Sequence, residues 1–473
     1  MDNTATRRAF ACALGAVVLL GLYGWLQNSV LFPRFAEFFP IGREIDTAVR
    51  AALYAAVALV ANRRPDLLDA KTIAATGVVA IASSTVLLYA AVTLESGALA
   101  VAGVAFFEVG YIWVAVFYGL ALCLLPTPRH TALAAAFGAA ASDCLELFVG
   151  TPAFPAGMAA LAALPLAALA LSWAPASRFL SEMQRQPAPS ELEISHPRAF
   201  LRPTSALFAC ILAFSVASGF GLTLNEVGHA PNQSAVVWIA MLGIAGVLAL
   251  RRKPGGEDAL FSFSVLLIIA GFLAAPFTFG TESAFANAPL RIGRTCVEIL
   301  ALMAIAAVGK RNPLAMITAL CMADCAQALG TIAGAVGGHT VNDLVGAGDA
   351  SAQAVTACAL FAFVAFLWLG FRRFSFEAAI DGIEKPTATV GDRTREASLD
   401  AACAAIGKAH GLTGRETEIF AMMARGRNVS FVQEHFVISR NTVKTHVKRI
   451  YKKLGVHSQQ ELIDLVEAPE DRA

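Results

Sequence analysis

Charged residues are scarce in this sequence. Asp, Glu, Lys and Arg make up 15% of the 473 residues, whereas 57% are hydrophobic. Soluble globular domains usually carry about 25% charged residues, so an ordinary soluble protein is excluded. The net charge of +1 hides an asymmetry, because the charges occur in short clusters between long apolar runs. The composition predicts a membrane protein with one short polar domain near the end of the chain.

Recognisable reactive motifs are also missing. The nine cysteines form no metal-binding or disulfide pattern, and eight of them lie in apolar segments, where cysteine behaves as a small hydrophobic residue. Cys321 and Cys325 are one helical turn apart, but no histidine cluster accompanies them. We find no nucleophile–base set, metal site or phosphate loop. We therefore expect no enzyme, no cofactor and no bound metal.

Long apolar runs fill residues 1–373. Twelve segments are apolar and long enough to cross a bilayer as helices. A polar linker with four prolines, 174–202, divides them into halves at about 1–173 and 203–373. We place the twelve spans near residues 9–28, 44–62, 72–92, 97–125, 131–150, 156–173, 203–222, 234–250, 259–278, 288–309, 313–336 and 351–371.

The two halves contain similar short stretches. Residues 62–65, Asn-Arg-Arg-Pro, parallel residues 250–254, Leu-Arg-Arg-Lys-Pro. Ala-Ser-Asp-Cys at 141–144 in the fifth span parallels Met-Ala-Asp-Cys at 322–325 in the eleventh. Such a 6+6 repetition resembles the architecture of major-facilitator transporters. The resemblance is architectural, because the loop after the second span lacks the glycine-rich motif of that superfamily.

Positive charge is concentrated in alternate loops. Seventeen Lys and Arg residues lie in one set of connections, and only Arg34 and Arg43 lie in the other. Basic loops remain in the cytoplasm, so we expect a multi-pass protein of the cell membrane with both termini cytoplasmic. The seventeen are Arg7, Arg8, Arg63, Arg64, Lys71, Arg129, Arg178, Arg185, Arg198, Arg202, Arg251, Arg252, Lys253, Lys310, Arg311, Arg372 and Arg373.

Ionisable residues also occur inside the expected spans, where they are costly and usually face a cavity or an ion-pair partner. One interpretation is internal pairing that fixes helix packing. The other is a central cavity for a small, anionic molecule held by Arg50, Arg291 or Arg294. Further charges in the spans are Asp46, Asp143, Glu146 and Asp324. The candidate ligand-sensing residues are Arg50, Glu108, Arg291, Arg294 and Glu298.

The end of the chain has a different composition. We expect a polar, flexible tether at 374–397 and a soluble helical domain at 398–473. Its helices are predicted at about 398–409, 414–425, 429–436, 440–454 and 459–467. Thr413 and Glu416 have the spacing of a capping box, Ser439 can cap the helix at 440, and Gly455 can end it. The short connection at 437–439 has the spacing of a helix-turn-helix.

The expected helix 440–454 carries the strongest functional signal. Val443, Val447, Ile450 and Leu454 follow the spacing of a buried stripe. Arg440, Lys444, Lys448, Arg449, Lys452 and Lys453 occupy its other faces, and no acidic residue lies between the first and the last of them. Such a helix suits the major groove of DNA. The alternative is a solvated basic face with no partner.

The segment 411–467 resembles the LuxR-type helix-turn-helix domain of bacterial transcription regulators. The resemblance implies that Lys444, Thr445 and Lys448 face bases, that Thr442 and nearby basic residues contact phosphate, and that the fourth helix helps to form a dimer. The usual Ser-Asn-Lys-Glu-Ile-Ala of the second helix reads Asn-Val-Ser-Phe-Val-Gln at 428–433. The matching residues are Leu412, Thr413, Arg415, Glu416, Glu418, Gly426, Ile438, Ser439, Thr442, Val443, Lys444, His446, Ile450, Lys453, Leu454, Gly455, Val456, Ser458, Glu461 and Leu462. The DNA-binding candidates are Arg440, Thr442, Lys444, Thr445, Lys448, Arg449, Lys452 and Lys453.

These patterns predict an all-α protein, with a twelve-helix transmembrane bundle followed by a four-helix LuxR-type domain. The expected function is a membrane-bound, ligand-responsive transcription regulator; the alternative is a transporter that carries a fused regulatory DNA-binding domain. Expected partners are double-stranded promoter DNA, the lipid bilayer, an unknown small-molecule ligand and a second copy on DNA, with RNA polymerase as a further candidate. No receiver-like domain precedes the tail, so phosphorelay control is not expected.

Overall fold

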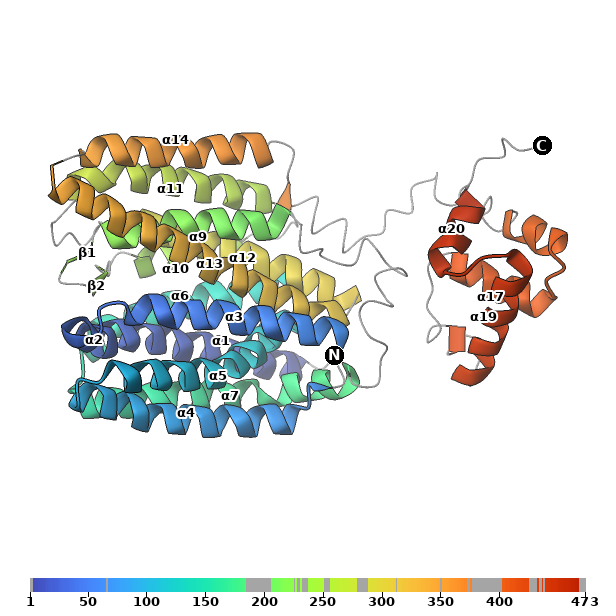
Figure 1. Ribbon diagram of the computed structural model, residues 1–473, viewed down its shortest axis with the longest axis horizontal. Coiled ribbons are helices and arrows are strands. Elements are labelled where there is room, and N and C mark those ends of the chain that lie inside the picture. The colour runs from blue at the N-terminus through green and yellow to red at the C-terminus, as the bar shows by residue number, and fades with distance from the viewer. Residues whose placement is uncertain are drawn as a thin grey trace.

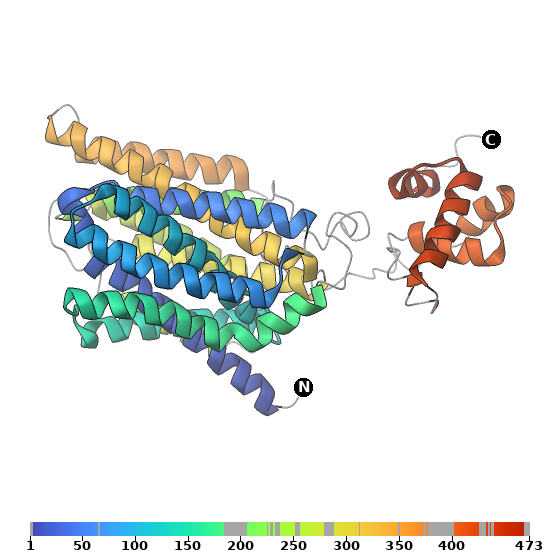
Figure 2. The same ribbon diagram turned by 60° about the horizontal axis from the view of Figure 1, so that its bottom comes forward.

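The computed structural model is helical apart from one short strand pair, β1 (Glu226–Val227) with β2 (Ala230–Pro231). The helices form a bundle of long helices and a separate group near the end of the chain (Figures 1 and 2). The structure describes residues 3–64, 67–183, 206–224, 226–227, 230–231, 237–250, 256–278, 288–311, 313–348, 351–371, 375–376, 402–424, 432–433, 436 and 439–467.

The first half of the bundle consists of helices joined by short connections with polar caps. Asp69 accepts a hydrogen bond from the Thr72 amide at the start of α4, and Ser96 and Thr127 cap α5 and α6 in the same way. Each cap begins the next helix, so the connections between these helices are only a few residues long. The elements are α1 (Asn3–Leu26), the π-helix η1 (Gln27–Leu31), α2 (Phe32–Phe38), α3 (Gly42–Arg63), α4 (Ala70–Thr93), α5 (Gly97–Cys123), α6 (Pro128–Val149) and α7 (Phe154–Met183).

The second half repeats the pattern with six long helices. Each of the twelve expected spans coincides with a helix, and within the described residues nine stretches are long and apolar enough to cross a membrane. The exceptions are α3, which carries charges in its first turns, and the shorter apolar α9 and α10. Twelve crossings therefore remain a prediction. The helices are α9 (Ala206–Leu224), α10 (Val237–Leu250), α11 (Glu257–Thr278), α12 (Ala288–Arg311), α13 (Pro313–Gly346) and α14 (Ala352–Phe371).

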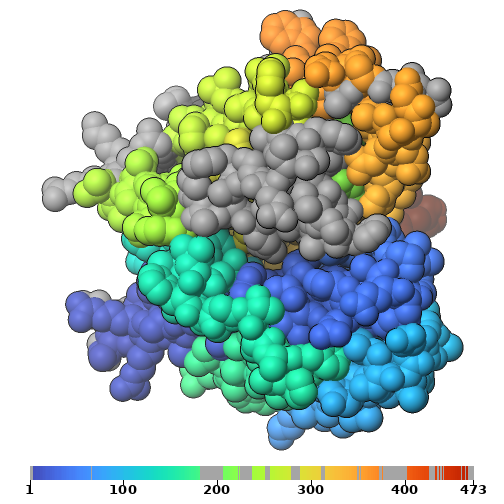
Figure 3. Space-filling view, turned by 90° about the vertical axis from the view of Figure 1, so that its left-hand side faces the viewer, coloured from blue at the N-terminus to red at the C-terminus, as the bar shows by residue number. Residues whose placement is uncertain are grey.

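The contacts between the halves follow a two-fold pattern. The second long helix, α3, packs on the eleventh, α13, and the fifth, α6, packs on the eighth, α10. In a 6+6 repeat the second helix corresponds to the eighth and the fifth to the eleventh. The two packed pairs are therefore equivalent, as such a repeat requires. Figure 3, which faces the end of the bundle away from the N-terminus, shows the two halves side by side. The N-terminus and the end of α14 lie at the opposite end (Figure 1).

Three helices extend well beyond their expected spans. The sixth, α7, continues to Met183, so the first part of the expected linker, 174–183, is helical. The first continues through η1 and α2 to Phe38, because a π-turn at 27–31 admits one extra residue per turn without ending the helix. The eleventh, α13, continues to Gly346, so the loop expected after residue 336 is mostly helix. His339, which falls within that expected loop, therefore lies on α13, where its Nε2 atom is 3.2 Å from a carboxylate oxygen of Glu44 on α3.

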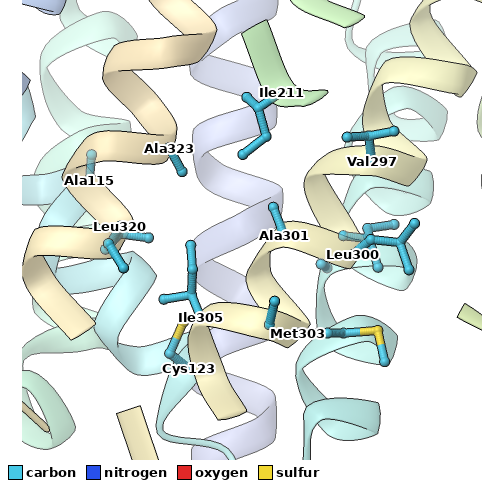
Figure 4. Packing of buried hydrophobic residues seen from close by; sticks show 14 of the residues in the cluster. Ala115, Cys123, Ile211, Val297, Leu300, Ala301, Met303, Ile305, Leu320 and Ala323 are labelled. Carbon is cyan, nitrogen blue, oxygen red and sulfur yellow. The ribbon is translucent and has the colours of Figure 1, made fainter. Parts of the chain in front are cut away.

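One end of the bundle is filled with apolar side chains. Leu120 and Cys123 of α5, Ile305 of α12 and Leu320 of α13 are all at most 4% exposed, and Figure 4 shows this packing at the crossing of the helices. Gly119 allows α5 to approach α13 closely, since a Cβ there would lie 2.4 Å from the side chain of Leu320. In a bilayer, van der Waals contacts stabilise such packing, because lipid tails are as apolar as these side chains. The result is a solid core between α5, α12 and α13.

The C-terminal helices have a core of their own. The predicted helices 440–454 and 459–467 are confirmed as α19 (Arg440–Leu454) and α20 (Gln459–Glu467), and the predicted helix 414–425 is described as α17 (Gly414–Ala424). Residues 402–409 are also helical. Most of the expected helix 429–436 lies outside the described residues. The buried cluster joins these elements through Cys403, Ile419, Phe420, Met423, Ala424, Val432, Val443, Ile450, Leu454, Val456 and Leu462.

A short contact fastens the chain after α14 to α11. The Phe376 amide and the Ser375 hydroxyl both donate to the carboxylate of Asp258, each at 2.6 Å. The Phe376 ring is fully buried and lies 5.2 Å from the ring of Phe261. Residues 375–376 fall within the expected tether 374–397, whose remainder lies outside the described residues, as does the linker from 184 to 202. We call this contact the Phe376 anchor.

Candidate nucleic-acid interface and membrane cavity

Helix α19 separates an apolar face from a basic one. Ser439 caps its first turn through the Thr442 amide, and Gly455 ends it in the left-handed conformation with φ 71°. Val443 and Ile450 are fully buried against the core. These caps and the buried stripe fix which side of the helix faces solvent. The exposed candidates on α19 are Thr442, Lys444, Thr445, Lys448, Arg449, Lys452 and Lys453.

Local hydrogen bonds use some of the polar candidates. The hydroxyl of Thr442 lies 2.8 Å from that of Ser439, and Thr445 donates to the carbonyl of Asn441 at 2.8 Å. Both hydroxyls retain acceptor capacity for a further donor. The side chain of Arg440 lies outside the described residues. Lys444, Lys448, Arg449 and Lys452 thus form one exposed basic surface, which we call the basic face.

Lys453 has a different role from the basic face. Its ammonium group donates to the Glu416 carboxylate at 2.6 Å and to the Gly411 carbonyl at 2.9 Å. Glu416 also closes the predicted capping box, because its carboxylate accepts from the Thr413 amide while its own amide donates to the Thr413 hydroxyl. The hydrogen bond from Lys453 lowers the pKa of Glu416 to about 2. Lys453 therefore holds α19 to the start of α17, and its charge is used within the domain.

Arg415 contributes to the interface by an interaction that the motif did not indicate. Its guanidinium lies 3.8 Å from the centre of the Phe436 ring and donates to the Phe436 carbonyl at 3.5 Å. This cation–π contact holds Phe436 against the start of α17. Arg415 and Phe436 lie 21 residues apart in the chain, so no periodic pattern in the sequence indicates this contact.

The membrane bundle encloses a polar cavity of about 480 Å³. Residues of α1, η1, α3, α5, α9, α12 and α13 line it. Four of the five predicted ligand-sensing residues, Arg50, Arg291, Arg294 and Glu298, lie in its wall. The fifth, Glu108, is completely buried behind Arg50. Charges from separate spans therefore converge on one space. The lining stops at Tyr118 on α5, Glu298 on α12 and Asp324 on α13, where the solid apolar core begins.

Arg50 is bound by two carboxylates. It makes hydrogen bonds of 2.8 and 3.2 Å with both oxygens of Glu108 and one of 2.8 Å with Asp46. The carboxylates are 0% and 4% exposed, and the guanidinium lies 5.6 Å from the centre of the Tyr111 ring. A two-pronged Arg–carboxylate pair offsets much of the desolvation cost of burying these charges. The spacing of Asp46 and Arg50 in the sequence suggested the first contact, but not that with Glu108.

The other two arginines are also paired. Arg291 of the second half contacts Asp143 of the first at 2.5 Å, and it interacts electrostatically with Glu146 one turn further along α6. The guanidinium of Arg294 lies 2.9 Å from Glu298, one turn along α12. Each arginine thus has a carboxylate partner, which favours the ion-pairing interpretation. An anionic ligand would compete with these carboxylates for the same guanidinium groups.

Several cavity residues had not been selected from the sequence. Gln27 and Asn28 belong to the π-helix, and this kind of helix is frequent at functional sites. Tyr54, Tyr111 and Tyr118 supply aromatic rings from α3 and α5. A π-turn has no clear sequence pattern, and single tyrosines in apolar spans do not differ from packing residues. Only the three-dimensional arrangement brings these residues to one wall.

Fold and site together define a multi-helix membrane domain that carries a helix-turn-helix domain. Residues 410–466 match the family described as "Bacterial regulatory proteins, luxR family". The chain is 46% identical over 52 residues to "Uncharacterized response regulatory protein YgeK" of Escherichia coli (strain K12). This match covers 11% of the chain and 35% of the relative, about a third of its length. The C-terminal domain is a LuxR-type helix-turn-helix domain, the domain type of DNA-binding transcription regulation.

The bundle is similar to solved transporter structures. The human organic anion transporter MFSD10 (TETRAN) superposes with a TM-score of 0.52 and 14% identity, over 77% of this chain and 99% of that chain. The Escherichia coli fucose:proton symporter FucP gives a TM-score of 0.46 and 13% identity, over 76% and 98% of the chains. The first likeness shows a major-facilitator-like fold for this multi-pass membrane domain, and at this identity it shows the fold alone. Neither the regulator family nor the transporter fold is an enzyme class.

Proposed function

We propose that this protein is a membrane-bound transcription regulator in which the cavity binds a small molecule and the basic face binds promoter DNA. The observation that carries the proposal is the exposed basic face on a LuxR-type domain in the same chain as a polar membrane cavity. The four lysine and arginine side chains of that face can contact phosphates, and Lys444 and Lys448 lie one turn apart for base contacts. Two copies of the domain bind paired half-sites, and RNA polymerase is a candidate contact of the bound pair.

The membrane orientation is part of the proposal. The seventeen basic residues in alternate loops place both termini in the cytoplasm, where DNA is. The N-terminus and the end of α14 lie at one end of the bundle, which supports an even number of crossings (Figure 1). Reporters fused after Arg129 or Arg252 should remain cytoplasmic, and those placed within 223–233 should cross the membrane. A cytoplasmic signal from 223–233 would contradict twelve crossings.

Promoter occupancy tests the function directly. Crosslinked DNA is recovered with the full-length protein from cells, and transcripts are compared with and without the gene across candidate small molecules. We expect enrichment at specific promoters and a change in transcription there when the small molecule is added. A variant with both Lys444→Ala and Lys448→Ala should lose the enrichment at equal membrane levels. Equal enrichment with this variant would contradict the assignment of α19 as the recognition helix.

A working transporter with a fused DNA-binding domain is the second candidate function. The fold shared with a transporter favours it. The apolar core between α5, α12 and α13 closes one end of the bundle, as expected for one state of an alternating-access transporter, so it does not distinguish the two candidates. Purified protein in vesicles would distinguish the two candidates. A regulator should bind the small molecule without accumulating it, whereas accumulation that depends on cavity residues would favour the transporter.

A further inference from the structure

Asp324 differs from the other acidic residues of the cavity. It lies on α13 at the inner limit of the space, among residues of α3, α5 and α12. Within the described part of the chain no Lys or Arg comes within ion-pair distance of it, and its neighbours are the Tyr54 hydroxyl and, electrostatically, Glu298 and Arg50. Arg50 is already bound by Asp46 and Glu108. A carboxylate in this position is costly without a positive partner.

The charges around the cavity leave an excess of negative groups. The wall holds four arginines and four carboxylates, but Glu108 and Asp143, behind the wall, bind two of these arginines as well. The formal balance is therefore negative, and no described arginine of the wall lies within ion-pair distance of Asp324. The arginines are Arg43, Arg50, Arg291 and Arg294, and the carboxylates are Glu44, Asp46, Glu298 and Asp324.

Aromatic rings line the wall around Asp324. Tyr54 and Tyr118 contribute to the same wall, and Tyr111 joins them from α5, where its ring already faces the Arg50 guanidinium. Faces of aromatic rings attract cations, most strongly where water is excluded. The volume of about 480 Å³ is within the range of small-molecule sites. A carboxylate beside several tyrosines in such a space is suited to an ammonium group with a short organic chain or ring.

We propose that the ligand of this cavity is a small organic cation, an amine or a quaternary ammonium ion, with its charge at Asp324 and its apolar part against the tyrosines. This inference rests on the proposed function, in which the cavity binds a small molecule. It replaces the anionic ligand that the arginines alone had suggested. The bound cation supplies the positive charge that Asp324 lacks. Binding by pairing with a membrane-embedded carboxylate favours the helix arrangement in which that carboxylate remains exposed to the cavity.

The charge preference of the cavity can be measured without knowing the ligand. Thr331 lines the cavity seven residues beyond Asp324 on the same face of α13. In the full-length Thr331→Cys protein we would compare modification by two methanethiosulfonates of similar size, one with a trimethylammonium group and one with a sulfonate. The first reagent belongs to the proposed ligand class. Peptide mass spectrometry reads residue 331 alone, and the same ratio in unfolded protein corrects for intrinsic reactivity.

We expect the corrected rate ratio to favour the ammonium reagent by about tenfold. Adding Asp324→Asn should lower the ratio by about threefold or more. Asp343→Asn, the same change at an exposed position near the end of α13, should leave it unchanged. Glu298→Gln should act in the same direction as Asp324→Asn, so the test remains decisive if the latter protein does not assemble.

Three results would overturn the inference: a ratio at or below one, no modification by either reagent, or a ratio unaffected by both carboxylate substitutions. The measurement uses no DNA. Loss of promoter binding by the basic-face variants would therefore leave this outcome unchanged, and failure of the cation inference would leave the DNA-binding proposal unchanged.

Discussion

The two groups of positive charge in this protein are used in opposite ways. In the membrane domain, Arg50, Arg291 and Arg294 each meet a carboxylate at 2.9 Å or less. On α19, the basic face points to solvent, and among the basic side chains that the structure describes there only Lys453, at its edge, is paired. A cation that is neutralised inside the fold stabilises the fold, whereas a cation left in water remains available for a partner. Pairing, more than residue type, separates structural from functional charges here.

The largest effect is expected where a paired charge is removed from the membrane domain. Arg50→Met would leave Asp46 and Glu108 buried without a positive partner, so we expect a loss of about 3–5 kcal/mol of folding free energy. Thermal unfolding of the purified protein in detergent measures it. Arg34→Gln, at an exposed arginine on α2, is the matched control and should have little effect. An unchanged midpoint for Arg50→Met would show that the cluster contributes nothing to stability.

The next effect concerns the paired lysine of the tail. Lys453→Met should lower the stability of the 396–473 fragment by about 1.5–3 kcal/mol, because it removes a charged hydrogen bond from Glu416. Chemical denaturation measures this loss, with Lys452→Met on the exposed face as the control. If the two variants were equally stable, Lys453 would contribute no more to folding than the exposed lysines of the basic face.

Acid unfolding tests the same pair, Lys453 and Glu416, from the side of the carboxylate. The folded pKa of Glu416, about 2, lies below its ordinary value of 4.5. The unfolded chain therefore binds more protons between these values, and the pair stabilises the domain above pH 4.5 and loses this contribution as pH falls towards 2. Glu416→Gln should flatten the dependence of stability on pH in that window. An unaltered pH profile would contradict the depressed pKa.

A fourth test removes unpaired charge from the basic face. Lys444→Ala and Lys448→Ala should each weaken specific promoter binding by about 1–3 kcal/mol where the side chain reads a base. The protein fold should be unaffected, in contrast to the Lys453 variant. Gel shifts at several salt concentrations measure both affinity and salt dependence. Lys408→Ala, an exposed lysine on the preceding helix 402–409, is the matched control; a similar loss in this variant would indicate a diffuse charge effect.

The smallest effect is expected at the half-exposed pair of Arg294 and Glu298. Arg294→Gln releases Glu298 to the cavity, so a cationic inducer should act at a concentration lower by up to about tenfold. Promoter output against inducer concentration, at matched protein levels in the membrane, measures the shift. DNA binding by the isolated tail should not change. If the dose curves of the wild type and the variant superimpose, Arg294 does not influence the response and is a packing residue.

Local chemistry explains which parts of the fold were predictable. Thr413, Ser439 and Gly455 act through neighbours three or four residues away, so the helix boundaries of the tail could be predicted from the chain. Apolar run length likewise placed a helix on every expected span. The π-turn at 27–31 and the extension of α13 depend on packing between distant helices, and no run length encodes them.

The site was predictable to a lesser extent. The energetic cost of a charge in the bilayer predicts that Arg50, Arg291 and Glu298 face a cavity or a partner. The structure brings all three to one cavity. Which carboxylate meets which arginine depends on the arrangement of the helices, as Arg291 and Asp143 from opposite halves illustrate. The same limit applies to Lys453, whose partner Glu416 lies on another helix. Spacing therefore identifies the participants, and three-dimensional packing decides the pairs.

The Phe376 anchor has a consequence for the position of the target gene. The chain between residue 376 and the helix at 402 can extend at most about 90 Å at about 3.5 Å per residue. With the cytoplasmic orientation proposed above, α19 can meet DNA only in a layer of about that depth beneath the bilayer. A regulated promoter must therefore be brought to the inner surface of the membrane. The chromosome's own movement, rather than diffusion of the regulator, would then limit how soon transcription responds.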